Sequence, residues 1–244
     1  MRVVISGASS GIGAALAAHY AASGATVAAI SRRAVEGYEF SYQADVTDTA
    51  ALKRIAADFI ARCGVPDLVI ANAGIGTGTL GEDIEDVAKL RRILDVNVCG
   101  MAATLAAFAP AMKSAGRGTL AGIASVAGFR GLGGNGAYSA SKAAAISWLE
   151  SLRVELHGSG VNVVCICPGY IDTPLTRVNR FRMPFLISAE DGARRIARAI
   201  AAKRRLAIVP WQMAAVSVLL RVMPGALFDR LAAGAPRKPR DPQP

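Results

Sequence analysis

The stretch from Ser125 to Lys142 holds a serine, a tyrosine and a lysine whose order and spacing suit acid–base chemistry. Tyr138 and Lys142 are four residues apart, so in a helix their side chains lie on one face, one turn apart. Ser125 comes at the end of an apolar run that is expected to be a strand, and a glycine-rich loop, GFRGLGGNGA, follows it. These three side chains predict a proton-transfer site if the fold brings Ser125 back to the helix.

A second glycine-rich segment, SGASSGIG, follows the first apolar run of the chain. Its glycines, Gly7, Gly11 and Gly13, have the spacing GxxxGxG, which differs from the GxGxxG dinucleotide pattern. A loop of this kind between a strand and a helix lets the backbone approach a phosphate and directs helix N–H groups toward it. By itself this spacing is a weak indication of nucleotide binding.

Two arginines, Arg32 and Arg33, follow the next apolar run, and no acidic residue comes before Glu36. In dinucleotide-binding folds an acidic residue at this place binds the ribose 2′-hydroxyl, whereas an arginine accommodates a 2′-phosphate. The arginines therefore favour NADP(H) over NAD(H) if a dinucleotide site exists, and a solvated loop is the alternative.

Short apolar runs alternate with helical segments along the whole chain, which is typical of a parallel sheet covered by helices. The expected strands are residues 2–5, 25–30, 39–44, 67–71, 118–125, 161–167 and 206–209. The expected helices include residues 48–62, 84–109, 138–157 and 188–203. The pattern predicts a single α/β domain, a three-layer doubly wound parallel sheet (Rossmann-like) of about seven strands. The candidate site residues fall at expected carboxyl ends of strands, where such folds bind ligands.

The chain divides into three expected parts. Residues 1–203 form the dinucleotide-binding catalytic domain, with a substrate lid at about 174–190. Residues 204–233 form an apolar and basic extension packed on that domain, and the proline-rich residues 234–244 form a disordered tail. Residues 206–231 could instead lie on a membrane surface. Docking on the protein's own core or on a second subunit is preferred, because Pro224-Gly225 interrupts the amphipathic run.

Composition and charge limit the classes of partner that the protein is expected to bind. The chain has 244 residues and a formal net charge of +10, but no nucleic-acid motif and no basic–aromatic interleaving, so we expect no nucleic acid. The first residues enter a strand directly and do not read as a signal peptide, and the cysteines lack metal or disulfide spacing. We expect a cytoplasmic protein without a metal, at most peripheral at the inner face of the membrane. The uncharged runs 96–112 and 143–149 could form a helical interface of a homo-oligomer, a dimer or tetramer.

Taken together, these motifs resemble those of the short-chain dehydrogenase/reductase family, YxxxK type. The matching segments run in the family's order from residue 3 to residue 174: SGASSGIG at 6–13, Asp45, ANAG at 71–74, Asn97, Ser125, Tyr138-x-x-x-Lys142 and PGYIDT at 168–173. Two departures are mild, since Ser6 stands where threonine is usual and Ala71 where asparagine is usual. The C-terminal part is similar, more weakly, to a bacterial subgroup of unassigned oxidoreductases.

The resemblance implies that NAD(P)(H) lies across the sheet and that Asn97, Ser125, Tyr138 and Lys142 form the catalytic set. By the same resemblance, Asp45 and Val46 lie at the adenine, residues 72–74 at the adenosine ribose, and Thr173 at the nicotinamide carboxamide. With the two arginines, the expected cofactor contacts are Gly7, Ser9, Ser10, Gly11, Ile12, Gly13, Arg32, Arg33, Asp45, Val46, Asn72, Ala73, Gly74, Tyr138, Lys142, Pro168, Gly169, Ile171 and Thr173.

The implied activity is oxidoreduction of a CH–OH group, with Tyr138 as acid in reduction and base in oxidation. A tyrosine with its ordinary pKa of about 10 is a poor base at neutral pH. A lysine ammonium about 4 Å away, at an effective dielectric of about 20, would favour the ionised phenol by about 4 kcal/mol, or roughly three pKa units. Ser125 would bind the substrate oxygen. Asn97 would hold a water that links Lys142 to solvent, and a hydrogen-bonded core amide is the alternative.

The expected lid is apolar at residues 183–187 and basic at Arg177, Arg180 and Arg182. It suggests that the small-molecule carbonyl or alcohol substrate is apolar or amphipathic, with a lipid-like substrate among the candidates, and that it has an acidic end. The alternative function, from a different class, is a non-catalytic NADP(H)-binding sensor or scaffold on the same fold. The intact serine–tyrosine–lysine set argues against it.

Overall fold

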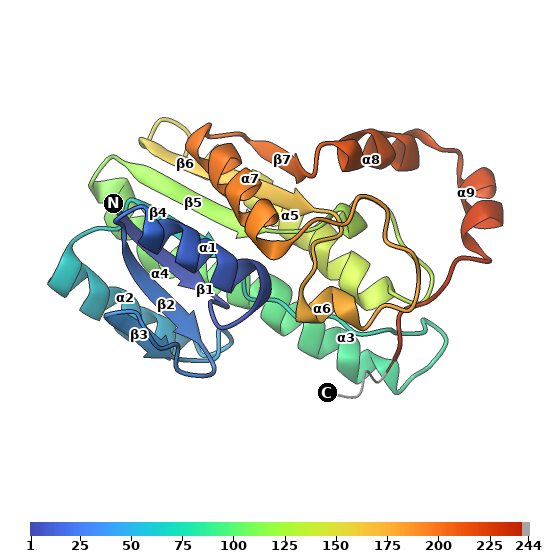
Figure 1. Ribbon diagram of the computed structural model, residues 1–244, viewed down its shortest axis with the longest axis horizontal. Coiled ribbons are helices and arrows are strands. Elements are labelled where there is room, and N and C mark those ends of the chain that lie inside the picture. The colour runs from blue at the N-terminus through green and yellow to red at the C-terminus, as the bar shows by residue number, and fades with distance from the viewer. Residues whose placement is uncertain (241–244) are drawn as a thin grey trace.

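A computed structural model of the chain describes residues 1–240. Within them, seven strands form one parallel sheet in the order β3-β2-β1-β4-β5-β6-β7 (Figure 1). The strands are β1 (Arg2–Ser6), β2 (Thr26–Ser31), β3 (Phe40–Gln43), β4 (Leu68–Ala71), β5 (Gly118–Ile123), β6 (Val161–Pro168) and β7 (Leu206–Val209). This is the predicted doubly wound sheet, and each strand's bounds lie within two residues of those expected.

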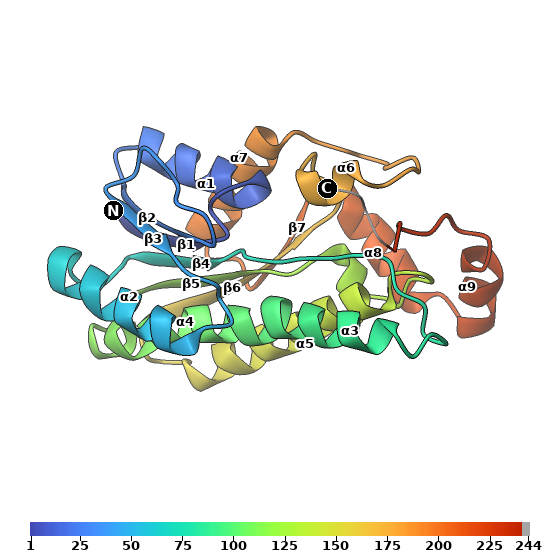
Figure 2. The same cartoon turned by 90° about the horizontal axis from the view of Figure 1, so that it is seen from below.

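Helices cover both faces of this sheet, as Figure 2 shows. On one face lie α1 (Gly11–Ala22) and α7 (Ala189–Ala201), and on the other lie α2 (Thr49–Cys63), α4 (Gly100–Ser114) and α5 (Gly136–Glu155). Both faces are therefore dry, which is why the central strands are apolar at nearly every position. All four residues of β4, for example, are buried.

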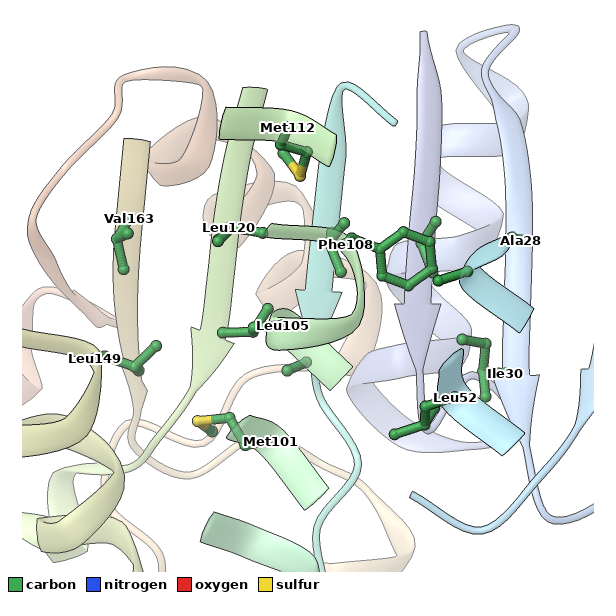
Figure 3. Close-up of a cluster of buried hydrophobic side chains, with 14 of the residues drawn as sticks. Ala28, Ile30, Leu52, Met101, Leu105, Phe108, Met112, Leu120, Leu149 and Val163 are labelled. Carbon is green, nitrogen blue, oxygen red and sulfur yellow. The ribbon is translucent and has the colours of Figure 1, made fainter. Parts of the chain in front are cut away.

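The core on the α2–α4–α5 side is built from large side chains that interdigitate between helix and strand (Figure 3). Leu105 and Phe108 of α4 are fully buried against the sheet, as are Leu120 of β5 and, at 1 % exposure, Leu149 of α5. Burying one such side chain contributes roughly 1.5–3 kcal/mol. This packing fixes α5, and with it Tyr138 and Lys142, against β5 and β6.

The described residues contain one helical run, Asp86–Ser114, that is long and apolar enough to cross a membrane by length and composition alone. It comprises α3 (Asp86–Leu94), a π-helical turn η1 (Asp95–Cys99) and α4. Of its most apolar window 44 % is buried, and Phe108 and Met112 are fully buried against the sheet. Most of the uncharged run 96–112 therefore belongs to the interior of this fold, and within it only Cys99, Ala106 and Pro110 are exposed.

The C-terminal extension lies beyond the carboxyl ends of the strands (Figure 1). Its helices are α8 (Gln212–Val222) and α9 (Gly225–Ala232), while α6 (Pro174–Arg177) belongs to the expected lid. Of α8 only Met213 and Ser217 are buried, and α9 has no buried residue. Its exposed apolar side chains are Trp211, Val218, Leu219, Val222, Leu227 and Leu231. Contact of this face with a second subunit or with a membrane surface stays a prediction.

Part of the tail differs from the disorder expected of residues 234–244. Residues 235–240 return from α9 across the domain toward the segment that precedes α3 (Figure 1). Gly78 N donates a hydrogen bond to Pro239 O at 2.9 Å, and the guanidinium of Arg240 pairs with Asp83 and Asp86. A proline-rich, charged composition indicates little burial of its own, but it does not exclude fixation by the backbone and carboxylates of another segment. Residues 241–244 lie outside the described residues.

Candidate active site

A cleft opens at the carboxyl ends of the central strands, and it gathers nearly all the predicted site residues. The predicted residues that line it are Gly7, Ser9, Ser10, Gly11, Ile12, Arg32, Asp45, Val46, Asn72, Ala73, Gly74, Ser125, Tyr138, Lys142, Pro168, Gly169, Ile171 and Thr173. Three others, Gly13, Arg33 and Asn97, do not line it. Residues distant in sequence thus form one continuous wall, as the carboxyl ends of parallel strands allow.

The loop between β1 and α1 is shaped for close approach of a ligand to the backbone. Gly7 has a φ of +70°, and a Cβ on Gly13 would lie 2.2 Å from the Gly7 carbonyl oxygen. Asn72 Nδ2 donates to the carbonyl oxygens of Ser6 and Gly7, each at 3.2 Å, and so ties the loop to the end of β4. Ser10 is the N-cap of α1 but makes no side-chain capping bond. The loop therefore offers free helix N–H groups and a hydroxyl, which fit a dinucleotide phosphate.

The far end of the cleft is polar and charged. Arg32 lines the cleft, whereas Arg33 lies outside it. Asp45 accepts hydrogen bonds from Thr47 and, at 3.2 Å, from Arg92, and these bonds lower the pKa of Asp45. Arg92, which also lines the cleft, was not anticipated from the sequence, because α3 reaches this site only through the packing of its helical run beside α2.

Tyr138 and Lys142 lie on the face of α5 that is turned toward the sheet. Lys142 is 3 % exposed, and its Nζ donates to the carbonyl oxygen of Ile123 at 2.9 Å. The same Nζ lies 5.6 Å from the centre of the Tyr138 ring. Ser125 follows β5, where its Oγ accepts from Ala127 N at 3.2 Å and donates to Pro168 O at 3.4 Å. The three residues predicted from spacing are thus brought together.

The electrostatics of this group differ from the sequence expectation. Burial raises the pKa of Tyr138, and a hydrogen bond with Ser125 opposes that rise only in part. Burial also lowers the pKa of Lys142 to about 8. The expected depression of the tyrosine pKa assumed a fully charged lysine about 4 Å from the phenol. In the folded chain removal from water acts on both groups and disfavours both charged forms.

Asn97 is fully buried within the π-helical turn η1. Its Nδ2 donates to Ile75 O at 2.9 Å and to Ser141 Oγ at 3.0 Å, while its Oδ1 accepts from Ile75 N at 2.8 Å. These are the bonds of a satisfied core amide, the alternative that the sequence left open. They also join the loop after β4 to α5 one residue before Lys142, so Asn97 positions the helix that carries Tyr138.

The comparisons with known proteins agree with this architecture. The family model described as short chain dehydrogenase matches residues 1–182. An uncharacterized oxidoreductase of Myxococcus xanthus is 42% identical over 94% of this chain and 95% of its own length. The chain belongs to the short-chain dehydrogenase/reductase family.

Other members of the family are similar over most of the chain. A ketoacyl reductase, HetN, of Nostoc sp. is 32% identical over 85% of this chain and 77% of its own length. Among solved structures, a short chain dehydrogenase from Burkholderia cenocepacia in complex with NADP has a TM-score of 0.82 and 27% identity, covering 94% of this chain and 96% of that one. Short-chain dehydrogenases/reductases are oxidoreductases that bind nicotinamide cofactors, and the cleft of this member has the glycine loop and polar walls that such a cofactor requires.

Proposed function

We propose that this short-chain dehydrogenase/reductase is an NADP(H)-dependent enzyme that acts on a carbonyl or secondary alcohol, with Tyr138 as the general acid and base. The observation that supports this most strongly is the continuity of one cleft. It runs from Arg32 past the glycine loop to Ser125, Tyr138 and Lys142. A cofactor laid along it would have its phosphates at the loop and its reactive ring beside Tyr138.

The residues that would hold the cofactor follow from this placement. The N-terminus of α1 and Ser10 would bind the pyrophosphate, and Arg32 would bind a 2′-phosphate. Thr173, which is 7% exposed, packs against Gly11 at the other side of the loop and would face the nicotinamide end. When bound, the cofactor supplies or accepts the hydride, which no side chain can do.

Proton transfer falls to the chain's own residues. Ser125 Oγ would donate a hydrogen bond to the substrate oxygen, and Tyr138 would give its proton to that oxygen as negative charge develops there. Lys142 would stabilise the phenolate that remains. Because burial raises the pKa of Tyr138, its hydroxyl is protonated at neutral pH, which is the form that carbonyl reduction needs. At neutral pH Tyr138 is therefore ready to act as the acid when the enzyme reduces a carbonyl.

The test is a panel of ketones, aldehydes and secondary alcohols assayed with NADPH or NADP, read by the absorbance of the reduced nicotinamide. Tyr138→Phe should lower kcat at least about 10³-fold while the Kd for NADPH stays within about twofold, because only the proton donor is removed. Tyr42→Phe removes the hydroxyl of a tyrosine outside the cleft, where it bonds Asp58, and is the matched control that should leave kcat unchanged.

Two outcomes would contradict the proposal. Turnover that survives in Tyr138→Phe would show that another group supplies the proton. NADPH binding without turnover of any panel member, by wild type or variant, would favour the sensor or scaffold on the same fold.

A further inference from the structure

The C-terminal residues 235–240, called the strap here, run beside the substrate end of the catalytic cleft and are bonded to the segments that border it. Thr77 Oγ1 donates to the carbonyl oxygens of Pro239 and Arg240, and Gly78 N donates to Pro239 O at 2.9 Å. Arg240 is paired with Asp83 and, at 3.1 Å, with the buried Asp86. These contacts lie in the segment between β4 and α3, directly after the cleft residues Asn72–Ile75. The strap is therefore held at both its backbone and its end.

Two glycines leave the room that the strap needs. A Cβ on Gly78 would lie 2.2 Å from the Lys238 carbonyl oxygen, and a Cβ on Gly134 would lie 2.7 Å from Arg237 Cβ. Gly134 belongs to the glycine-rich loop between Ser125 and Tyr138. Side chains at these two positions would displace the strap. The strap therefore packs on the segment after β4 and on the glycine-rich loop after Ser125, and both border the substrate end of the cleft.

The strap places one cation next to the proposed proton donor. Lys238 Nζ lies 5.9 Å from the centre of the Tyr138 ring and donates to Leu175 O at 3.2 Å. Leu175 itself lines the cleft. Among the ion pairs of the described residues none involves Lys238, although an ammonium carries three donors. Burial lowers the pKa of Lys238 to about 8, the response of a cation that lacks an anionic partner.

The other basic residues near this end of the cleft are less suited to bind an anion. Arg177, one of the lid arginines that suggested an acidic substrate end, is bonded to Asp172 through two nitrogens, at 2.7 and 3.3 Å. Arg180 and Arg182 are exposed to solvent. A charge in water contributes less to binding than one held in a partly dry site. Lys238 is thus the cation best placed to meet an anionic group of a molecule bound at Tyr138.

We propose that Lys238 binds a carboxylate of the substrate, so that the enzyme prefers carbonyl compounds that also carry a carboxylate group. This inference rests on the proposed oxidoreductase function, since it assumes that the carbonyl binds at Tyr138. The carboxylate accepts the hydrogen bonds that the ammonium has left over, and the strap orients the molecule with its carbonyl toward Ser125 and Tyr138. Charge-assisted bonds of this kind are the strong ones among hydrogen bonds.

The experiment compares straight-chain keto acids with their methyl esters, using full-length enzyme and NADPH. Wild type should have a higher kcat/KM for the acid. In Lys238→Met the value for the acid should fall about 10- to 100-fold, mainly through KM, while the value for the ester stays within about twofold. Arg237→Met removes the neighbouring positive charge of the same strap, and it should leave the acid-to-ester ratio unchanged.

A second pair of variants tests the placement of the strap without altering Lys238. Gly78→Ala puts a methyl group against the Lys238 carbonyl and should lower the acid-to-ester ratio as Lys238→Met does. Gly81→Ala, where an added Cβ meets no atom within 4 Å, is the matched control. Binding is also read without turnover, by calorimetry of a saturated straight-chain carboxylate with the NADP-loaded enzyme. The heat of binding of this carboxylate should be absent in Lys238→Met.

The outcomes separate this inference from the proposed function. Equal turnover of acid and ester, unchanged in Lys238→Met, would overturn the inference and leave the oxidoreductase intact. Higher activity toward both substrates in Lys238→Met and Gly78→Ala would show that the strap is an autoinhibitory cover, and would also overturn it. If no carbonyl is reduced, the function fails, and the calorimetry still decides whether Lys238 binds a carboxylate.

Discussion

Two lysines face the ring of Tyr138, of which Lys142 is buried and Lys238 is half-buried. Their Nζ atoms lie 5.6 Å (Lys142) and 5.9 Å (Lys238) from the ring centre, and burial lowers the pKa of each to about 8. The pKa of Tyr138 itself is raised by burial, so the phenol keeps its proton throughout the neutral range. What changes near pH 8 is the positive charge that stabilises the phenolate formed when the proton leaves.

This arrangement predicts the pH dependence of reduction. For a neutral ketone with NADPH, kcat/KM should be constant below about pH 7 and fall as the pH rises through about 8, because Lys142 loses its charge, while Lys238 serves the carboxylate of an acidic substrate and not the proton transfer. Lys142→Arg keeps a charge at every accessible pH, so its profile should lose that descending limb even if its activity is lower. Initial rates of wild type and Lys142→Arg between pH 6 and 9.5 measure these two profiles.

Lys238→Met provides the control for this profile, since it removes the second lysine and leaves Lys142 in place. The fall of kcat/KM near pH 8 should persist in this variant. If instead the limb disappears in Lys238→Met and remains in Lys142→Arg, then Lys142 is not the group whose titration controls proton transfer.

Cofactor selectivity is the other property set by single residues. Arg32 lines the cleft and Arg33 does not, although the two are adjacent. Arg32→Ala should therefore raise the Kd for NADPH about 10- to 100-fold and leave the Kd for NADH nearly unchanged, because only NADPH has a 2′-phosphate. Arg33→Ala is the matched control and should change neither value more than about threefold. Fluorescence titration with NADPH and NADH measures the Kd of each variant for each cofactor. If Arg32→Ala weakened NADPH and NADH binding equally, the 2′-phosphate would be recognised elsewhere.

For single residues, the sequence predicted which side chains lie together in the cleft, but not their hydrogen-bond and ion-pair partners. The glycine loop, Ser125, Tyr138 and Lys142 were recognisable because their spacing and their places at strand ends reflect the chemistry directly. Arg92 and Lys238 carry no such local pattern. Arg92 reaches the cleft on a helix, and Lys238 reaches the Tyr138 ring on a strap, and both positions depend on tertiary packing. The same packing reverses the expected pKa shift of Tyr138.

Among the secondary-structure elements, the amino ends of three neighbouring strands are joined by one carboxylate. Asp67, just before β4, accepts from Arg2 of β1 at 2.8 Å (backbone N) and 3.1 Å (Nη2), and is also paired with Arg117 before β5. Partial burial acts to raise the pKa of Asp67, but the bonds from Arg2 and Arg117 outweigh it and lower that pKa to about 2. This cluster lies at the opposite end of the strands from the cleft, so it bears on stability alone.

Asp67→Asn should lower the free energy of unfolding by about 1 kcal/mol at pH 7, a value reduced for the partial exposure of the pair. Because the folded pKa lies below the unfolded one, this stabilisation is present above about pH 4 and is lost as the pH falls toward 2. The difference in unfolding free energy between wild type and variant, measured with urea, should therefore narrow between about pH 4 and 2. Glu150→Gln, which removes a more exposed pair with Arg153, should show almost no gap at pH 7. A gap that is independent of pH would mean that the ion pairs do not cause it.

The strands were predictable because runs buried on both faces are short, apolar and bounded by turn residues. The end of the helical run Asp86–Ser114 was less predictable. The sequence predicts its end at Ala109, before Pro110, yet α4 continues to Ser114 with that proline inside it. Pro110 is exposed, while Phe108 and Met112 on either side of it are fully buried, so tertiary packing holds a helix that local propensity would end.

For the molecule as a whole, the C-terminal extension and the substrate end of the cleft form one connected assembly. Arg130, in the glycine-rich loop between Ser125 and Tyr138, donates through Nη1 to the carbonyl oxygens of Leu220 and Met223, each at 3.0 Å. Its guanidinium also lies 4.4 Å from the centre of the Phe228 ring. One side chain thus joins that loop to the end of α8 and to α9, from which the strap continues back past the substrate end of the cleft. The position of the strap depends on this junction.

Arg130→Ala should therefore loosen α8, α9 and the strap together, while the sheet and the cofactor end of the cleft stay intact because Arg130 does not line the cleft. Hydrogen–deuterium exchange should show faster exchange in residues 212–240 and unchanged exchange in β1 to β6, and the Kd for NADPH should stay within about twofold. Arg130→Lys keeps the charge but not the planar guanidinium, so its exchange should be intermediate. Arg153→Ala, on the outer part of α5, should resemble wild type. If Arg130→Ala leaves exchange in residues 212–240 unchanged, the extension is held by α8 packing alone, through Met213 against Gly169, and the loop and strap are independent.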